Sequence, residues 1–302
     1  MDHAAAHPRL AGGGVLPARD IACPVCGSTR RRPFAREKGL SIVRCPSCRL
    51  LYVNPQPDPR AVREFFSSQY IPDDRLLQAN FDAWRRDALA REAAFIRQWA
   101  PSGRMVDVGC AGGVFLSCFE PGYDRHGIEL STRAVEVARR RFGLTVHQGT
   151  LGDAPFAEGT FDLVTILDTF IYLPDPRGDL ARVRRLLRPG GCLAIELPGY
   201  WWRLVRCHGP LSLALRGGWS TMNPDCFLFF YAPRPFARLL ALEGFTLVAV
   251  HQENTPARPG RLLSSANRVY MALSRTAARI TAGRALLAPK ILYVARRDAS
   301  RP

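Results

Sequence analysis

The middle of the chain alternates between short apolar runs and segments whose apolar residues recur at helical spacing. The apolar runs predict strands, and they lie at 104–108, 123–128, 144–148, 161–167 and 192–197. The segments that predict helices lie at 112–119, 131–142 and 176–187. This alternation is typical of strand–helix–strand units. It predicts an α/β fold with a Rossmann-like, doubly wound and mostly parallel sheet.

The segments outside this core follow other patterns and divide the chain into five parts. Apolar residues in 81–99 recur at helical intervals between charges, and a Pro-rich break at 54–57 precedes that helical region. The expected parts are a disordered leader at 1–19, a zinc ribbon at 20–57, a helical linker or cap at 58–100, the core domain at 101–254, and a basic amphipathic helix with a final strand, 290–296, at 255–302.

The last part of the chain carries more than half of the net positive charge. The formal net charge is +16, and residues 255–302 contain nine Arg and one Lys against one acid. One interpretation is peripheral contact with an anionic membrane, and the other is a helix packed on the domain with its Arg face in solvent. On a helix, one face would carry Arg261, Arg268, Arg275 and Arg279, and the opposite face Leu262, Val269, Leu273, Ile280 and Leu287.

Composition indicates a globular chain. Hydrophobic residues make up 47%, and no uninterrupted apolar run reaches the roughly 18 residues of a membrane-spanning helix. The start of the sequence lacks a basic region followed by an apolar stretch, so no signal peptide is predicted. The expected location is the cytoplasm, with peripheral contact to the inner membrane face if the tail binds lipid. The nine cysteines are then expected to be thiols or metal ligands.

Four of these cysteines form two Cys-x-x-Cys pairs near the start of the chain. The pairs are Cys23 with Cys26 and Cys45 with Cys48, separated by eighteen residues. That spacing falls within the range of zinc sites with four Cys ligands. Two such pairs complete a tetrahedron with no open position for chemistry. The sequence therefore predicts one structural zinc ion.

The most informative run is MVDVGCAGGVFL at 105–116. A predicted strand reaches Asp107, a loop of small residues runs from Gly109 to Gly113, and Glu129 ends the next strand 22 residues after Asp107. Glycines let the backbone approach a ligand, and a carboxylate about 20 residues on suits ribose hydroxyls. Asp107 would repel a pyrophosphate but suits an ammonium group. The run therefore predicts a site for a nucleoside-containing cofactor that carries a cation.

This run resembles the first motif of class I S-adenosylmethionine (SAM)-dependent methyltransferases. The segments 161–176 and 182–198 are similar to the fourth and fifth strands of that family, and the resemblance covers roughly 20–55 and 70–250. A ribbon followed by such a core is similar to a bacterial subgroup that often acts on glycans, sugars or secondary metabolites. The cofactor-binding residues that the resemblance implies are Asp107, Gly109, Cys110, Gly113, Glu129, Leu130, Thr150, Leu151 and Asp168.

The chain departs from the family where a catalytic base is expected. Many relatives carry Glu-His after the fourth strand, where this chain has Ile171 and Tyr172. A tyrosine with a pKa of about 10 is a poor base at neutral pH. We expect the catalytic candidates to be Tyr172 and His208, with Asp225 as an alternative to His208. Thr150 also stands where the family often has Asp, which weakens the expected adenine contact.

The expected activity is SAM-dependent methyl transfer to a glycan, nucleotide-sugar, lipid-linked or secondary-metabolite acceptor. An aromatic-rich segment at 199–232 is the expected acceptor cover, although such clusters also form plain core. One alternative is a SAM-binding protein that has lost catalysis. A nucleic-acid methyltransferase is disfavoured, because the chain lacks an Asn-Pro-Pro-Tyr or Asp-Pro-Pro-Tyr motif and a Pro-Cys motif. The acceptor atom, oxygen, nitrogen or carbon, and the oligomeric state stay open.

Overall fold

The computed structural model describes residues 18–69, 83–119, 122–208, 222, 224, 227–254 and 261–299. Most of the expected leader, 1–17, and the segment 70–82 lie outside these ranges. The largest sheet among the described residues has seven strands in the order β12-β13-β10-β9-β6-β7-β8. Its strands are β6 (Gly103–Val108), β7 (Tyr123–Glu129), β8 (Thr145–Gln148), β9 (Phe161–Leu167), β10 (Leu187–Pro198), β12 (Phe245–Glu253) and β13 (Lys290–Arg297).

Five neighbouring strands of this sheet are parallel, and one edge is antiparallel. Strands β8, β7, β6, β9 and β10 pair in parallel, whereas β13 runs antiparallel to both β10 and β12. The predicted doubly wound, mostly parallel sheet is therefore confirmed. Because β13 is antiparallel, its first residues meet the carboxyl ends of the parallel strands, which is the edge where α/β sheets bind ligands.

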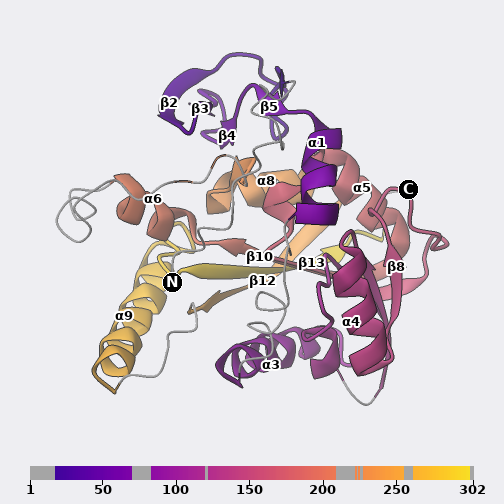
Figure 1. Cartoon of the computed structure of the whole chain (residues 1–302). Helices are drawn as coiled ribbons and strands as arrows, with labels where there is room; N and C mark the ends of the chain where they lie inside the picture. Colours follow the sequence, from indigo (N-terminus) through magenta and orange to yellow (C-terminus); the bar gives the residue numbers. More distant parts are fainter. Residues whose placement is uncertain are drawn as a thin grey trace.

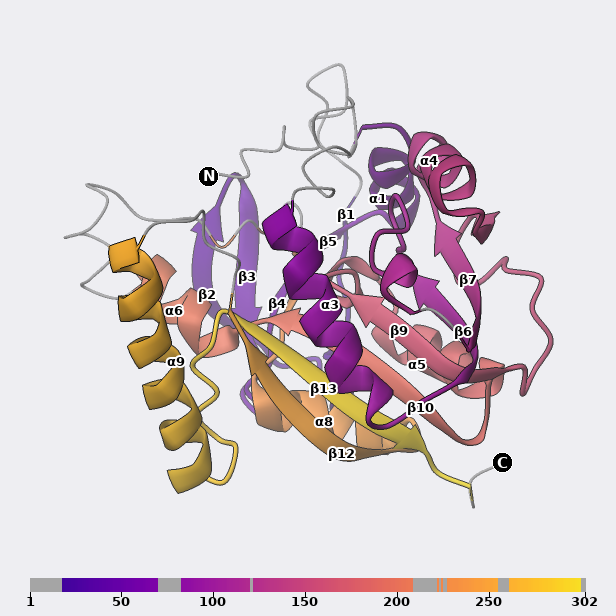
Figure 2. The same ribbon diagram turned by 90° about the horizontal axis from the view of Figure 1, so that it is seen from below.

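Helices cover both faces of the sheet (Figure 1). Figure 2, seen from below, places α3 (Ala83–Arg97) in front of the sheet, with α5 (Pro176–Leu186) and α8 (Pro233–Leu242) behind it. Helix α4 (Thr132–Phe142) lies on the same side as α3 in Figure 1. Neighbouring strand residues feed opposite cores: Met105 packs with the α3 and α4 side chains, and Val106 with those of α5 and α8. This is the period-two alternation of a strand buried on both faces.

The segment after the small-residue loop is not the predicted helix. Instead of a helix over 112–119, the structure has only a 3₁₀ turn, Leu116–Cys118. Ala111 has a φ of 45° and Gly113 a φ of 79°, and residues in the left-handed region cannot continue a right-handed helix. This loop therefore does not lead into a helix N-terminus whose backbone N–H groups could bind a ligand.

The N-terminal segment forms a second, four-stranded sheet, in which one strand comes from the C-terminal half of the chain. The order is β11-β4-β3-β2, where β2 is Arg32–Glu37, β3 is Leu40–Arg44, β4 is Leu51–Val53 and β11 is Phe229–Phe230. Phe229 pairs with Tyr52, and the Val53 N–H donates to the Leu228 carbonyl at 2.9 Å. Two residues of the expected leader, 18–19, form β1 (Ala18–Arg19), which pairs with β5 (Gln56–Pro57).

The remaining helices border the ligand-binding edge. Helix α1 (Pro59–Glu64) continues as a π-helical turn, Phe65–Gln69, and α6 (Tyr200–His208) follows β10 directly. Helix α9 (Arg261–Ile280) precedes β13. The structure corrects the tail prediction in one respect, because Leu287 lies beyond the end of α9. Val269, Leu273 and Ile280 are exposed to solvent, which disfavours the interpretation in which the apolar face packs on the domain.

Candidate functional site

Asp107 lies in β6, next to the last residue of that strand, and is buried in the centre of the ligand-binding edge. Its side chain is 3% exposed, and its Oδ1 accepts a hydrogen bond from Thr165 Oγ1 on the neighbouring β9 at 2.7 Å. Burial raises the pKa of Asp107 to about 7, against the hydrogen bond from Thr165, which lowers it. A cation placed beside this carboxyl would favour its ionised form.

Glu129 ends the adjacent strand and fixes the small-residue loop. One carboxylate oxygen, Oε2, accepts from the backbone N–H of Ala111 at 2.9 Å, and the other, Oε1, accepts from the N–H of Ser131 at 2.9 Å. Burial raises the pKa of Glu129 although both hydrogen bonds lower it. An ionised carboxylate has about four lone-pair positions, so Glu129 can still accept from a further donor.

Gly109 and Gly113 of the loop are glycines for reasons of packing. A Cβ on Gly109 would lie 2.3 Å from Thr169 Oγ1, and one on Gly113 would lie 2.4 Å from Leu144 Cδ1. Both residues also have φ near 79°, where residues with a Cβ are strained. These glycines hold the loop against β9 and β8, and so place it over the strand ends.

Cys110 does not offer its side chain or its amide to a ligand. The side chain is 4% exposed and packs against Gly127. The N–H groups of Gly109 and Cys110 both donate to the Ile128 carbonyl, at 2.8 and 3.2 Å. A role for Cys110 in cofactor binding would therefore be limited to the shape of the loop.

An open cavity of about 540 Å³ lies at the ends of β7 and β8. The sheet contributes Leu130, the residue after Glu129, together with Gln148 and Gly149 at the end of β8. Nearby, Thr150 donates to Asp153 Oδ1 at 2.7 Å and Leu151 is buried. The opposite wall is formed by α1 and the turn that follows it, through Arg60, Arg63, Glu64 and Ser67.

The structure also brings together an ionic cluster that the sequence did not predict as a unit. Lys290, the first residue of β13, donates to Asp168 Oδ2 at 2.6 Å and to Glu196 Oε1. Asp168 follows β9, Glu196 lies in β10, and Glu92 of α3 is buried beside them at 2% exposure. We name these four residues the Lys290 cluster. Asp168 is its most accessible carboxylate, with 38% of the side chain exposed against 1% for Glu196.

The charges of the Lys290 cluster divide into a fixed ion pair and two protonatable acids. Burial opposes the charge of Lys290, but Asp168 and Glu196 together raise its pKa, so the ammonium persists at neutral pH. Lys290 in turn lowers the pKa of Asp168 against the effect of burial. Burial raises the pKa of Glu196 and of Glu92. The one feature of the sequence that pointed to Lys290 is that a lysine begins the apolar run KILYVAR.

The structure describes the side chain of one expected catalytic residue, Tyr172, but not those of His208 and Asp225. Tyr172 lies in a 3₁₀ turn after β9, where its ring stacks on Phe227 with centroids 5.5 Å apart and contacts Phe66 at 4.9 Å. His208 is the last residue of α6, but its side chain lies outside the described part of the structure, as does the whole of Asp225. Tyr172 therefore remains a prediction with a defined position, and His208 and Asp225 remain predictions without one.

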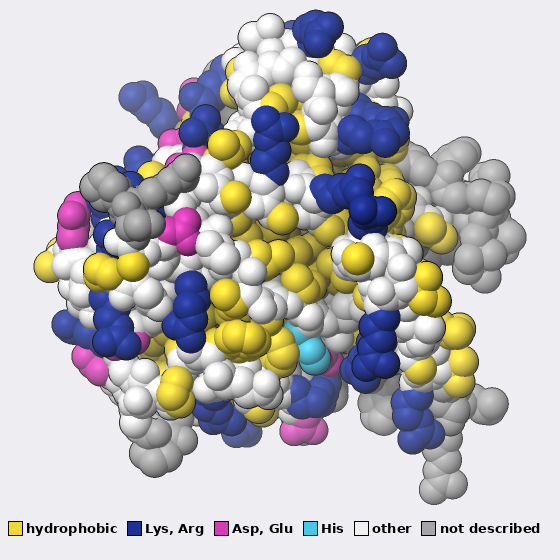
Figure 3. Space-filling view, turned by 180° about the vertical axis from the view of Figure 1, so that it is seen from behind, with side chains coloured by type: hydrophobic (Ala, Val, Ile, Leu, Met, Phe, Trp, Pro, Cys, Tyr) yellow, Lys and Arg dark blue, Asp and Glu magenta, His cyan; other side chains and the backbone are white. Residues whose placement is uncertain are grey.

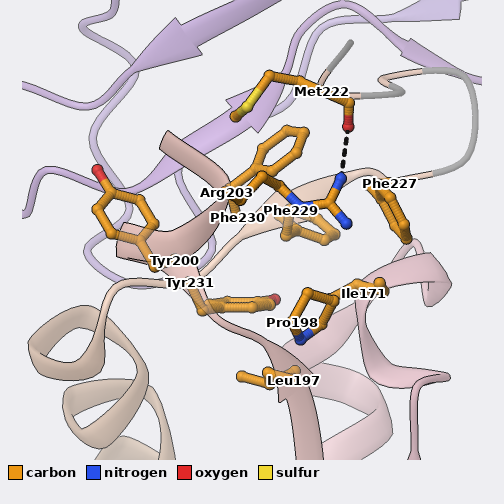
Figure 4. A pocket seen from close by; sticks show the side chains of 10 residues that line it. All are labelled: Ile171, Leu197, Pro198, Tyr200, Arg203, Met222, Phe227, Phe229, Phe230 and Tyr231. Atoms are coloured by element: carbon orange, nitrogen blue, oxygen red, sulfur yellow. Dashed lines mark hydrogen bonds between the residues drawn. The ribbon is translucent and has the colours of Figure 1, made fainter. Parts of the chain in front are cut away.

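The aromatic segment encloses a small cavity between α6, β10 and β11 (Figure 4). Its volume is about 10 Å³, so in this conformation the rings fill their own space as a core does. Arg203 of α6 lies across the cavity, with its guanidinium carbon 4.0 Å from the Phe227 ring centroid and a 3.0 Å hydrogen bond to the Met222 carbonyl. An acceptor would have to displace these side chains to enter here.

The four predicted zinc ligands converge in the N-terminal unit. Their Sγ atoms all lie within 4.8 Å of one another, and Cys23–Cys48 and Cys26–Cys45 are both 3.4 Å apart. Zn–S bonds of about 2.3 Å place tetrahedral sulfurs about 3.8 Å apart, so the set fits a zinc ion. A hydrogen bond from Cys23 lowers the pKa of Cys48 to about 5.

Comparison with known families decides what the central region is. Residues 106–195 match a family model described as a methyltransferase domain. These residues are therefore similar to methyltransferase domains. The match covers Asp107, Glu129 and Asp168, together with the second half of β6, the strands β7 to β9 and most of β10.

Curated relatives of the methyltransferase domain carry the name O-methyltransferase. One from Penicillium expansum is 31% identical over 118 residues, which are 36% of this chain and 43% of that protein. A ubiquinone biosynthesis O-methyltransferase of Methylococcus capsulatus is 36% identical over 126 residues, covering 38% and 53% of the two chains. The chain thus spans about half the length of the curated relatives it matches.

Solved structures agree in fold across a longer stretch. Magnesium protoporphyrin IX methyltransferase from Synechocystis, with bound SAH, aligns with a TM-score of 0.55 at 14% identity, over 80% of this chain and all of that one. A SAM-dependent methyltransferase from Thermotoga maritima aligns with a TM-score of 0.51 at 18% identity, over 78% and 98% of the two chains. At these identities the likeness shows the fold alone, and it confirms the predicted class I architecture.

Proposed function

We propose that this chain transfers the methyl group of SAM to a hydroxyl oxygen of a small-molecule acceptor. The observation that carries the proposal is the pair of carboxylates, Asp107 and Glu129, at the ends of adjacent strands, with an open cavity of about 540 Å³ that begins at Leu130, the residue after Glu129. The O-methyltransferase names of the curated relatives support oxygen over nitrogen or carbon.

In this proposal each part of the edge binds one part of the cofactor. Asp107 pairs with the methionyl ammonium, and Glu129 accepts from the two ribose hydroxyls with its remaining lone pairs. The cavity beside Leu130 takes the adenosine, where Thr150 and Leu151 border the base. Bound SAM supplies a methyl group that its sulfonium charge already activates, so alignment with the acceptor accounts for much of the rate.

The Lys290 cluster is the best-placed group for the proton of an acceptor hydroxyl. Asp168 is partly exposed just after β9, and Lys290 holds it in place at 2.6 Å. A hydroxyl that donates to Asp168 would lose its proton to that carboxylate as the methyl group transfers. Tyr172, the last residue of the 3₁₀ turn after β9, is the second candidate and would act by orienting the acceptor.

The acceptor class is narrowed by the aromatic segment. Rings from β11 and from the turn after β9 stack between α6 and the sheet, and Arg203 offers a positive charge among them. We propose an acceptor with a planar or apolar part, in the range of secondary metabolites and lipid-linked intermediates. Glycan and nucleotide-sugar acceptors of the resembling bacterial subgroup remain within the proposal, because sugars also stack on aromatic rings.

Calorimetric titration with SAM tests cofactor binding directly. Glu129→Ala removes two charge-assisted hydrogen bonds to the ribose, which are worth about 2–4 kcal/mol together, so affinity should fall by about 30- to 1,000-fold. Glu136→Ala is the matched control, because Glu136 is an exposed carboxylate of α4 that lies 3.9 Å from Arg140. Unchanged affinity in Glu129→Ala would refute the ribose assignment.

A binding protein without catalysis is the second candidate function. The feature that favours it is the pair Ile171 and Tyr172 in place of Glu-His. Incubation of the full chain with labelled SAM and a cell extract separates the two, because only an enzyme moves label to an extractable product. Label in product that disappears in Asp168→Asn but persists in Asp87→Asn, an exposed position on α3, would support the acceptor-side role.

We also propose that Cys23, Cys26, Cys45 and Cys48 hold one structural zinc ion. The supporting observation is the convergence of four Sγ atoms within 4.8 Å. Such a site has no open position, so the metal would stabilise the N-terminal unit and take no part in methyl transfer. Metal analysis of purified protein should give about one zinc per chain.

A further inference from the structure

Two helices on one side of the molecule carry most of its exposed apolar side chains. Eight large apolar side chains of the described residues are prominently exposed, and five of them lie on α6 and α9. Such a concentration marks an interaction site more strongly than scattered exposure does. These five residues, which we call the α6–α9 surface, are Trp201 (39% exposed), Val205 (52%), Val269 (61%), Leu273 (64%) and Ile280 (80%).

The orientation of α9 is set by contacts on its other side. Tyr270 packs its ring on Trp202 of α6 with centroids 5.3 Å apart, Met271 is 8% exposed, and Ser274 donates to Gln252 of β12 at 2.7 Å. Trp201 Nε1 also donates to the Arg284 carbonyl at 3.2 Å, which ties α6 to the loop after α9. The apolar row therefore faces solvent while a separate face of the same helix packs on the domain.

Arginines run alongside this apolar row. Arg268, Arg275 and Arg279 are exposed, and at 100° per residue they form a stripe next to the one that carries Val269, Leu273 and Ile280. Figure 3 shows hydrophobic and basic side chains side by side along the helix at the right of the view. Neither α6 nor α9 contains an Asp or a Glu in its sequence.

We propose that the α6–α9 surface docks on an anionic lipid bilayer. The apolar row would enter the boundary between headgroups and acyl chains, and the arginine stripe would contact the phosphates, as in helices that lie in the interface plane. Trp201 suits that depth, since Trp side chains concentrate at membrane–water interfaces. Among the described residues no helix is long and apolar enough to cross a membrane, so the contact is peripheral.

The surface is continuous with the aromatic cavity through α6. Tyr200 and Arg203 of this helix line the cavity, while Trp201 and Val205 point to solvent. Docking would bring the cavity to the bilayer surface. The docking proposal stands independently of the methyltransferase activity, since it rests on exposure and charge alone.

Vesicle co-sedimentation of the full chain tests the proposal. The probes are phosphatidylcholine vesicles with and without 30 mol% phosphatidylglycerol, at low and high salt. We expect binding only to the anionic vesicles, and loss at high salt as the Debye length falls from about 10 Å at 0.1 M to about 3 Å at 1 M. Each arginine near such a surface is worth about 5-fold in affinity, so a triple Gln variant of Arg268, Arg275 and Arg279 should bind about 100-fold more weakly.

Two further variants keep the result interpretable. Val269→Ser combined with Leu273→Ser and Ile280→Ser removes the apolar row and should also abolish vesicle binding, with an unchanged thermal melt because these side chains are exposed. The matched charge control replaces three exposed arginines of α4, on the other side of the molecule in Figure 1, and should bind as the parent does. The control positions are Arg133, Arg140 and Arg141.

Three results would overturn the proposal. Equal vesicle binding by the parent and both α9 variants would place the contact elsewhere, and equal loss in the α4 control would reduce it to net charge. A parent that ignores anionic vesicles but elutes as a dimer, which the Ser variant converts to monomer, would make the surface an interface between two copies of the chain.

Discussion

Replacing Asp107 with Asn is expected to weaken cofactor binding and yet stabilise the protein at pH 8. Burial holds the pKa of Asp107 at about 7 instead of 3.8, and each pKa unit is worth about 1.4 kcal/mol. The charged form therefore destabilises the fold by about 4 kcal/mol at pH 8. Asn can still accept the hydrogen bond from Thr165, but its buried amide N–H₂ costs about 1–3 kcal/mol. A net gain of about 1–3 kcal/mol in the free energy of unfolding follows.

The pH dependence of this gain in stability separates the effect of the titrating carboxyl group from the cost of burying the amide. A carboxyl whose pKa is raised in the folded state removes stability as pH rises from its unfolded pKa, near 3.8, through its folded pKa, near 7. Asn has no such titration. The advantage of Asp107→Asn over the parent should therefore be about 3 kcal/mol smaller at pH 5 than at pH 8, whatever the amide costs.

The assay is urea unfolding of the parent and the variant at pH 5 and pH 8 without SAM, followed by calorimetric titration with SAM at pH 8. Loss of a charged partner for the ammonium should weaken SAM binding by about 10- to 100-fold. Asp87→Asn, at an exposed position on α3, should change neither quantity. An advantage that is equal at both pH values would show that Asp107 is not held protonated, and unchanged SAM affinity would remove it from the ammonium site.

Three further changes test other parts of the structure. Lys290→Met leaves buried carboxylates without their counter-charge and should lower the free energy of unfolding by about 3–5 kcal/mol in urea; a loss below about 1 kcal/mol would mean that the cluster relaxes. Gly109→Ala meets Thr169 and a left-handed φ, so its melting temperature should fall, and Thr169→Ala in the same chain should restore part of it. Cys45→Ser should lose its zinc on metal analysis while Cys118→Ser keeps it, and full zinc in Cys45→Ser would refute the site.

The positions at parallel strand ends were open to prediction from the sequence. Asp107 and Glu129 each lie at or next to the end of an apolar run, and parallel strands bring such ends to one edge. The position of Lys290 at this edge could not be predicted in the same way, because β13 runs antiparallel and brings its first residue to that edge from the far end of the chain. Glu92 was hidden for a similar reason, since only the packing of α3 decides which of its acids is buried.

The segment 112–119 shows where a hydrophobic pattern fails to predict local structure. The pattern there is helical, but Gly113 takes a φ that a helix cannot accommodate, and packing against Leu144 enforces it. For α9 the sequence left two interpretations of the apolar stripe, packing or lipid contact. The structure shows that another face of the helix packs, through Tyr270, Met271 and Ser274.

Strand β11 belongs to two structures at once. Its residues Phe229 and Phe230 line the aromatic cavity and also pair with Tyr52 and Leu51 of the cysteine-bearing unit. Burial, and then the charges of Cys23 and Cys45, raise the pKa of Tyr52 to about 12, so this strand pair runs directly beside the thiols. The N-terminal unit and the cavity wall are therefore structurally coupled, although they lie far apart in the sequence. A chimera that exchanges residues 18–57 between relatives must therefore exchange 227–231 as well. Otherwise β11, which lines the cavity, will pair with a strand β4 from a different protein.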